Sequence, residues 1–185
     1  YVSTLVTQNV DRLHQKAGHK KVTDLHGRLD QVVCMDCGSI TSRDQIQAWL
    51  RDHNPHISGI EIKKPALRPD GDADVGDELV HEIKVPQCLG CNGLLKPNVV
   101  FYGSTVNKEV VNYLLDRLQK AKALLVIGTS LMVYSSFRFC KYANENQIPM
   151  ACVNQGLTRG DGLFSLKVGG DSSEILNQLI SYLPE

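Results

Sequence analysis

The fold class of this chain is decided by the stretch Ala123-Leu124-Leu125-Val126-Ile127-Gly128-Thr129-Ser130. Its apolar residues run without a break up to the glycine, which is typical of a strand buried on both faces of a parallel sheet. An amphipathic helix is predicted before it, from Asn107 to Ala121, and a second helix after it, from about Ser136 to Glu145. The next apolar run, Pro149 to Val153, predicts another buried strand.

This alternation of strands and helices predicts an α/β fold with a doubly wound, Rossmann-like parallel sheet. A last helix is expected to begin with Ser172 or Ser173 as its N-cap. Its buried side is expected to hold Ile175, Leu176, Leu179 and Ile180. Because the chain starts at Tyr1 and enters an apolar, strand-like run at once, we expect the sheet to be incomplete at its N-terminus, with an upstream part missing.

The composition is that of a globular protein. Among 185 residues, 42% are hydrophobic, and 20 basic residues balance 20 acidic ones. These values exclude a disordered, collagen-like or coiled-coil chain. With no net charge and no apolar run near the ~20 residues of a membrane helix, we expect neither nucleic acid nor a membrane as a partner.

Four of the six cysteines form two identical pairs, Cys34-Met35-Asp36-Cys37 and Cys88-Leu89-Gly90-Cys91. Two disulfides, or four small buried apolar side chains, are the alternatives to a metal site. A chain with this much Val, Ile and Leu does not need disulfides for stability, which favours zinc held by Cys34, Cys37, Cys88 and Cys91. Four thiolates would fill the coordination sphere of one structural zinc ion. Reduced thiolates imply an intracellular setting, either bacterial cytoplasm or mitochondrial matrix.

The two cysteine pairs bound a module of their own. We expect a zinc-binding module over residues 34–91, inserted into a Rossmann-like domain made of residues 1–33 and 92–185. Inside the module, a short helix from Arg43 to Arg51 is predicted to bury Ile46, Trp49 and Leu50. The acidic stretch at residues 70–74 superficially resembles a calcium loop. We reject calcium because Val75 and His81 occupy the positions where an EF-hand needs Gly and Glu.

Ligands of a doubly wound sheet bind beyond the carboxyl ends of its strands. Three polar segments follow predicted strands there: Thr7 to Asp11, Gly128 to Ser130, and Asn154 to Gly156. Their small or amide residues and free backbone N–H groups suit ribose hydroxyls and phosphates. A simple helix cap is the alternative for the second segment. The sequence contains neither a phosphate-binding Gly-Lys-Thr/Ser loop nor a Gly-x-Ser-x-Gly nucleophile elbow.

His26 is the candidate general base. A lone histidine is more often structural, but His26 lies close in sequence to Asn9 and Asp11, with which it could share one cleft. A neutral imidazole with a pKa of about 6.5 can accept a proton from a sugar hydroxyl. The residues alone therefore predict a zinc-stabilised α/β domain that binds a nucleotide.

Taken in order, the motifs of this chain resemble those of the sirtuins, the family of NAD-dependent protein-lysine deacylases. The segments that carry the resemblance are Thr7-Gln8-Asn9-Val10-Asp11, Leu25-His26-Gly27, the two cysteine pairs, Lys96-Pro97-Asn98-Val99-Val100-Phe101-Tyr102-Gly103, Gly128-Thr129-Ser130-Leu131 and Val153-Asn154. The insert containing Arg68-Pro69-Asp70-Gly71-Asp72 resembles the class II branch. The match runs over essentially the whole chain.

The resemblance implies roles for individual residues. NAD would be held by Gln8, Asn9, Val10, Asp11, Gly128, Thr129, Ser130, Asn154, Gln155, Gly156 and Ser172. Val100 and Phe101 would line the channel for the acyl-lysine of a protein or peptide substrate. In the family reaction the acyl oxygen attacks the ribose carbon that bears nicotinamide, nicotinamide leaves, and His26 would take a proton from a ribose hydroxyl. The products are lysine and O-acyl-ADP-ribose.

One departure from the family pattern is plain. Sirtuins open with a strand–Gly-Ala-Gly–helix unit and a flexible loop over the NAD phosphates, and this chain contains neither. We therefore expect residues 1–185 alone neither to bind NAD tightly nor to turn over. Two alternatives to deacylation stay open: ADP-ribosyl transfer to a protein, and a non-enzymatic zinc- and nucleotide-binding role.

Overall fold

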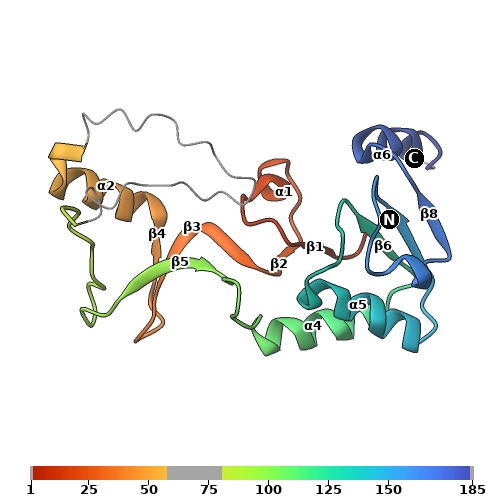
Figure 1. The fold of residues 1–185 in the computed structure, drawn as a ribbon, viewed down its shortest axis with the longest axis horizontal. Helices are drawn as coiled ribbons and strands as arrows, with labels where there is room; N and C mark the ends of the chain where they lie inside the picture. Colours follow the sequence, from red (N-terminus) through yellow and green to blue (C-terminus); the bar gives the residue numbers. More distant parts are fainter. Residues whose placement is uncertain (1, 58–80, 184–185) are drawn as a thin grey trace. The chain divides into compact units, whose positions relative to one another are not determined.

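A computed structural model describes residues 2–57 and 81–183 (Figure 1). The chain divides into two units, and each is described by itself. The first consists of Tyr1–Asn9, Leu13–His26 and Val100–Glu185, and the second of Val10–Arg12 and Gly27–Val99. The acidic stretch at 70–74 and the class II-like segment at 68–72 lie outside the described residues.

The first unit contains parallel strands joined by helices. Strands β6 (Leu124–Ile127), β7 (Met150–Val153) and β8 (Leu166–Val168) form one parallel sheet in that order. Strands β1 (Leu5–Thr7) and β2 (Val22–Asp24) form a parallel pair, with the short helix α1 (Leu13–Lys16) between them in sequence. The predicted alternation of strand and helix is confirmed.

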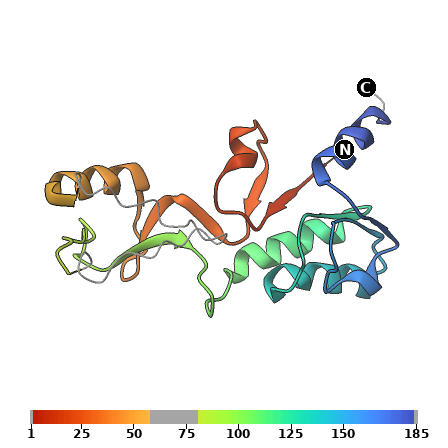
Figure 2. The same ribbon diagram turned by 45° about the horizontal axis from the view of Figure 1, so that its top comes forward.

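Two helices cover one face of the β6–β7–β8 sheet. Helix α4 (Lys108–Gln119) precedes β6, and helix α5 (Tyr134–Glu145) lies between β6 and β7 in sequence. Figure 2 shows both on the same side of these strands. The shared core consists mainly of Val111, Leu114, Leu118, Val126, Phe139, Cys140, Ala143, Met150 and Cys152. The amphipathic pattern thus placed these helices correctly.

The opposite face of this sheet is less covered than predicted. Val126 is buried, but Leu125 and Ile127 are 43% and 38% exposed, so the expected burial of β6 on both faces is wrong for the described residues. A continuous apolar run indicates two apolar faces, not which segments of the chain cover them. Helix α6 (Ser172–Ser181) lies on this side (Figure 2), and its predicted core residues Leu179 and Ile180 are exposed.

Asp171 caps α6, in place of the predicted Ser172 or Ser173. Its carboxylate accepts hydrogen bonds from the backbone N–H of Ser173 at 2.9 Å and of Glu174 at 3.1 Å. A carboxylate at this position satisfies two free N–H groups and also places negative charge at the positive end of the helix. A short 3₁₀ helix, η2 (Asp161–Leu163), lies between β7 and β8 in sequence.

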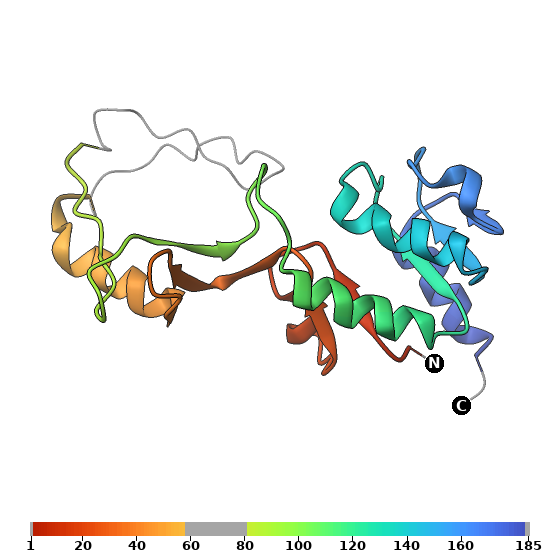
Figure 3. The same cartoon turned by 90° about the horizontal axis from the view of Figure 1, so that it is seen from below.

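The second unit is built on an antiparallel sheet (Figure 3). Strands β3 (Gly27–Cys34), β4 (Ile40–Ser42) and β5 (Leu95–Val99) pair in the order β4–β3–β5. The predicted helix is present as α2 (Arg43–His53), directly after β4. Its apolar residues are only half-buried. A 3₁₀ turn, η1 (Pro55–Ile57), follows it. The boundaries expected at residues 34 and 91 fall inside this unit, because β3 and β5 pair well beyond the cysteines.

Gly27 is required where β3 begins against β5. Its φ is +85°, and a Cβ there would overlap the carbonyl oxygen of Asn98. We expect Gly27→Ala to lower the free energy of unfolding by more than about 2 kcal/mol, because it adds a steric clash to backbone strain. Gly18 is the matched control, since its φ is +93° with nothing within 4 Å of a Cβ. Equal denaturation midpoints for Gly27→Ala and Gly18→Ala would contradict the steric argument.

Candidate active site and zinc centre

The four paired cysteines come together in the second unit. All four Sγ atoms lie within 4.8 Å of one another, with Cys34 to Cys91 at 3.5 Å and Cys37 to Cys88 at 3.7 Å. A tetrahedral zinc ion with Zn–S bonds of about 2.3 Å needs sulfurs about 3.8 Å apart. The thiol groups present therefore fit a zinc ion, and these separations are too long for disulfides.

Two similar turns present these sulfurs. In the first, Gly38 N–H donates to the carbonyl of Cys34, and in the second Asn92 N–H donates to the carbonyl of Cys88. The pairing of Cys34 with Leu95 across β3 and β5 brings the two turns together. A Cβ on residue 93, a glycine in this chain, would come within 2.9 Å of the Cys34 sulfur, so the site leaves no room for a side chain there.

The backbone of the second turn favours a thiolate at Cys88, whereas the neighbouring sulfurs raise the pKa of Cys91 to about 12. Hydrogen bonds from the backbone of Gly90 and Cys91 lower the pKa of Cys88 to about 6. Thiolate is the form of cysteine that binds metal. Cys140 and Cys152, by contrast, are fully buried in the first unit, and burial raises the pKa of Cys140 to about 11.

In the first unit, the carboxyl ends of β1 and β6 meet through side chains. The amide Nε2 of Gln8, just after β1, donates a hydrogen bond of 2.9 Å to the hydroxyl of Thr129, just after β6. The same hydroxyl accepts a bond from Leu131 N–H at 3.1 Å. Two of the segments that sequence reasoning selected therefore lie together, as expected for strand ends at one edge of a Rossmann-like fold.

His26 lies beside these residues. Its imidazole is half-buried, and burial lowers its pKa from 6.5, while a hydrogen bond to the backbone of Gln8 partly opposes this shift. Its Nε2 is 2.7 Å from the hydroxyl of Ser135 in the first turn of α5. Val100 N–H donates to the backbone carbonyl of His26, so a residue predicted to line the acyl channel is its direct neighbour. Phe101 follows, 49% exposed.

The third predicted segment, Asn154 to Gly156, lies in a loop that is hydrogen-bonded to the second predicted segment, Gly128 to Ser130. Arg159 N–H donates to the carbonyl of Ser130 at 2.8 Å, which joins the loop after β7 to the loop after β6. The Nζ of Lys167 donates to both carboxylate oxygens of Asp161 and to the carbonyl of Gly156. Asn154 holds the same carbonyl through its side-chain amide. The loop that carries Asn154 to Gly156 is therefore fixed by its own hydrogen bonds.

The remaining residues that the resemblance assigns to NAD are Asn9, Val10, Asp11 and Ser172. Asn9 is exposed, and its N–H donates to the hydroxyl of Thr7. Val10 and Asp11 belong to the second unit, where Val10 accepts a bond from Leu29 N–H. The cleft expected to join His26 with Asn9 and Asp11 stays a prediction. Ser172 is the first residue of α6.

Sequence reasoning missed four residues that the structure places in or behind the site: Ser135, Arg159, Asp161 and Lys167. Ser135 carried no signal beyond lying near the start of a predicted helix. Arg159 bonds to the distant loop after β6, Lys167 bonds to the carbonyl of Gly156, and Asp161 pairs with Lys167, and no motif encodes these contacts. Such contacts become visible only when the three strand ends are placed together.

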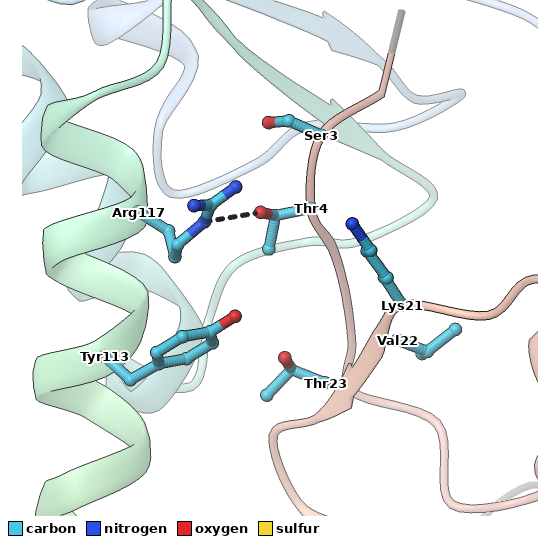
Figure 4. A pocket seen from close by; sticks show the side chains of 7 residues that line it. All are labelled: Ser3, Thr4, Lys21, Val22, Thr23, Tyr113 and Arg117. Atoms are coloured by element: carbon cyan, nitrogen blue, oxygen red, sulfur yellow. Dashed lines mark hydrogen bonds between the residues drawn. The ribbon is translucent and has the colours of Figure 1, made fainter.

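A pocket of about 340 Å³ in the first unit is lined by none of the predicted site residues (Figure 4). It is lined by Ser3, Thr4, Lys21, Val22, Thr23, Tyr113 and Arg117. The guanidinium of Arg117 donates to the hydroxyl of Thr4 at 3.2 Å, which ties α4 to the segment before β1. The residues that line this pocket include no histidine, cysteine or carboxylate.

Comparison with known proteins decides the family. The Sir2 family model matches residues 1–135. The chain belongs to the Sir2 family. This sirtuin chain is 51% identical over 164 residues to NAD-dependent protein deacetylase 2 of Bradyrhizobium diazoefficiens, and covers 59% of that protein. It is 45% identical over 172 residues to human mitochondrial sirtuin-4, an NAD-dependent protein lipoamidase, and covers 54% of it.

Solved structures agree with the sirtuin assignment. A Sir2 protein with a p53 peptide and NAD⁺ aligns over 97% of this chain and 62% of its own, with a TM-score of 0.73 and 25% identity. The sirtuin chain thus spans little more than half the length of the relatives named above. Among its described residues, no helix is long and apolar enough to span a membrane.

Proposed function

We propose that the protein containing this sirtuin chain is an NAD-dependent protein-lysine deacylase that releases nicotinamide, free lysine and O-acyl-ADP-ribose. The observation that carries the proposal is the linkage of His26 to the strand ends. Leu25 N–H, next to His26, donates to the carbonyl of Thr7, next to Gln8, and the side chain of Gln8 donates to Thr129. A base is thereby held beside the two segments that suit ribose and phosphate.

The base is in the correct form for this task. Because burial lowers the pKa of His26 below 6.5, the ring is neutral near pH 7 and can accept a proton from a ribose hydroxyl. The hydroxyls and N–H groups of Thr129 and Ser130 suit the ribose and phosphates, and Asn154 to Gly156 suit the adenosine side. Val100 and Phe101 are proposed to line the acyl-lysine channel, with the substrate backbone added as a strand.

Zinc has a structural role in this proposal. Four cysteines would fill its coordination sphere, so no position is left for water or substrate. Zinc bound there would join the two turns and support β3 and β5. Because four thiolates must stay reduced to bind it, we propose an intracellular, reducing setting for the protein.

Product analysis separates deacylation from ADP-ribosyl transfer. Full-length protein is incubated with NAD and an acyl-lysine protein, and both the small products and the protein are examined by mass spectrometry. We expect O-acyl-ADP-ribose in amounts equal to the lysine freed, and no added mass on the protein. Protein carrying ADP-ribose, with no O-acyl-ADP-ribose, would overturn deacylation in favour of ADP-ribosyl transfer.

A further inference from the structure

We propose that Ser135 is a positioning residue for His26. Its hydroxyl is hydrogen-bonded to Nε2 and so holds the imidazole ring in one orientation. The inference rests on the proposed function, in which His26 is the general base. It adds a residue from α5 to a site otherwise made of strand ends.

The contact joins two segments that are far apart in sequence. His26 follows β2, Ser135 lies in the first turn of α5, and Nε2 and Oγ are 2.7 Å apart. The backbone around the histidine is held on both sides, because Leu25 N–H donates to the carbonyl of Thr7 and Val100 N–H donates to the carbonyl of His26. With the backbone fixed, the orientation of the ring depends on what its two nitrogens contact.

The second ring contact determines the tautomer. The hydrogen bond to the Gln8 backbone raises the pKa of His26, which is the effect of an acceptor that stabilises a ring N–H. Because Nε2 faces Ser135, we assign this N–H to Nδ1. A neutral imidazole has one donor and one acceptor nitrogen, so the lone pair lies on Nε2 and the Ser135 hydroxyl is the donor.

Ser136, the next residue, makes the hydrogen bond that is usual for a serine in the first turn of a helix. Ser136 is buried, and its hydroxyl donates to the backbone carbonyl of Val133 at 3.0 Å. Such local bonds are the common use of serine in a first helical turn. The hydroxyl of Ser135 instead contacts the imidazole, so its role is not explained by the start of α5.

The hydroxyl can serve the ring before and after proton transfer. Because Nε2 has one lone pair, the ribose hydroxyl must first displace the Ser135 hydroxyl from it; the ribose O–H bond then breaks as the Nε2–H bond forms, Ser135 keeps its own proton, and its oxygen can accept from the new Nε2–H. A hydroxyl has both capacities, whereas an alanine methyl has neither. Ser135 thus holds the basic nitrogen in place without itself exchanging a proton with substrate.

The test uses the full-length protein with the variants Ser135→Ala, Ser135→Thr and Ser136→Ala. We expect Ser135→Ala to lower kcat for deacylation about 3- to 10-fold, the range for one lost hydrogen bond, with the KM for NAD unchanged. Ser135→Thr should restore kcat, because it keeps the hydroxyl. Ser136→Ala is the matched control and should keep the wild-type kcat.

Nitrogen-15 NMR of the His26 ring, recorded without NAD or peptide, gives a second readout. We expect the ring nitrogen shifts of Ser136→Ala to match those of the wild type, and the Nε2 shift of Ser135→Ala to differ, because Nε2 loses its hydrogen-bond partner. Unchanged ring shifts and unchanged kcat in Ser135→Ala would overturn the proposal, as would an equal loss of kcat in Ser136→Ala. Since the NMR readout needs no turnover, a wild type that fails to deacylate would count against the proposed function alone.

Discussion

Deacylation by the full-length protein is expected to slow about 10²- to 10⁴-fold when His26 is replaced by alanine, the usual contribution of a general base. In the proposed function the half-buried imidazole is the base, and burial lowers its pKa, which favours the neutral ring. Formation of deacylated lysine should be measured, because nicotinamide leaves before the proposed proton transfer. His53, which is exposed and stacks on Trp49, is the matched control, and His53→Ala should keep the wild-type rate. An unchanged rate in His26→Ala would remove this residue from the mechanism.

His26 also determines how the rate of deacylation is expected to depend on pH. The base is active when neutral, and burial lowers its pKa below the ordinary value of 6.5. The rate should therefore reach a plateau at neutral to alkaline pH and fall to half of it only below pH 6.5, as the ring becomes protonated. A profile of kcat/KM against pH measures this directly. An acidic limb centred above pH 7 would show that the ring is not in the environment described.

Loss of zinc is expected to have the second large effect. Binding of structural zinc contributes about 10–16 kcal/mol in small zinc domains, which exceeds the stability of most domains. We expect Cys34→Ser and Cys91→Ser to yield metal-free protein that aggregates, because two turns of the second unit lose what joins them. Metal content and thermal unfolding are the measurements.

Cys140→Ala serves as the control for zinc loss. Cys140 lies in the core of the first unit, so its replacement should cost stability but leave one zinc ion per chain. A soluble, metal-free and fully active Cys34→Ser/Cys91→Ser double variant would contradict a structural role for zinc.

Local patterns made part of the fold predictable. The apolar run before Gly128 gave β6, and the spacing of apolar residues gave α4 and α2, because these signals depend only on neighbours in sequence. The paired cysteines predicted the metal cluster for the same reason, since identical turns recur at both ends of the module.

The predictions of burial that proved wrong depend on contacts between segments that are distant in sequence. Nothing local to Leu125, Ile127 or Leu179 reveals that their side chains stay exposed, because exposure depends on which other segments cover that face. The start of α6 was misjudged for a different reason, since Asp171 and two serines are all good N-caps and only the backbone geometry selects one.

The site was predictable to the extent that it follows strand ends. Gln8, Thr129 and Ser130 were found by their place after apolar runs, and His26 by its place between two motifs. Ser135 could not be found, because its partner is a side chain far away in sequence and its position in a first helical turn is ordinary for serine.

The central claim is tested most directly by nicotinamide release from NAD by the full-length, zinc-loaded protein. It should be assayed with and without peptides that carry acetyl-, lipoyl-, biotinyl- or glutaryl-lysine. We predict release that requires one or more of these peptides and is matched by an equal amount of deacylated peptide, which would also identify the preferred acyl group. Folded, zinc-loaded protein that releases no nicotinamide with any of them would contradict NAD-dependent deacylation.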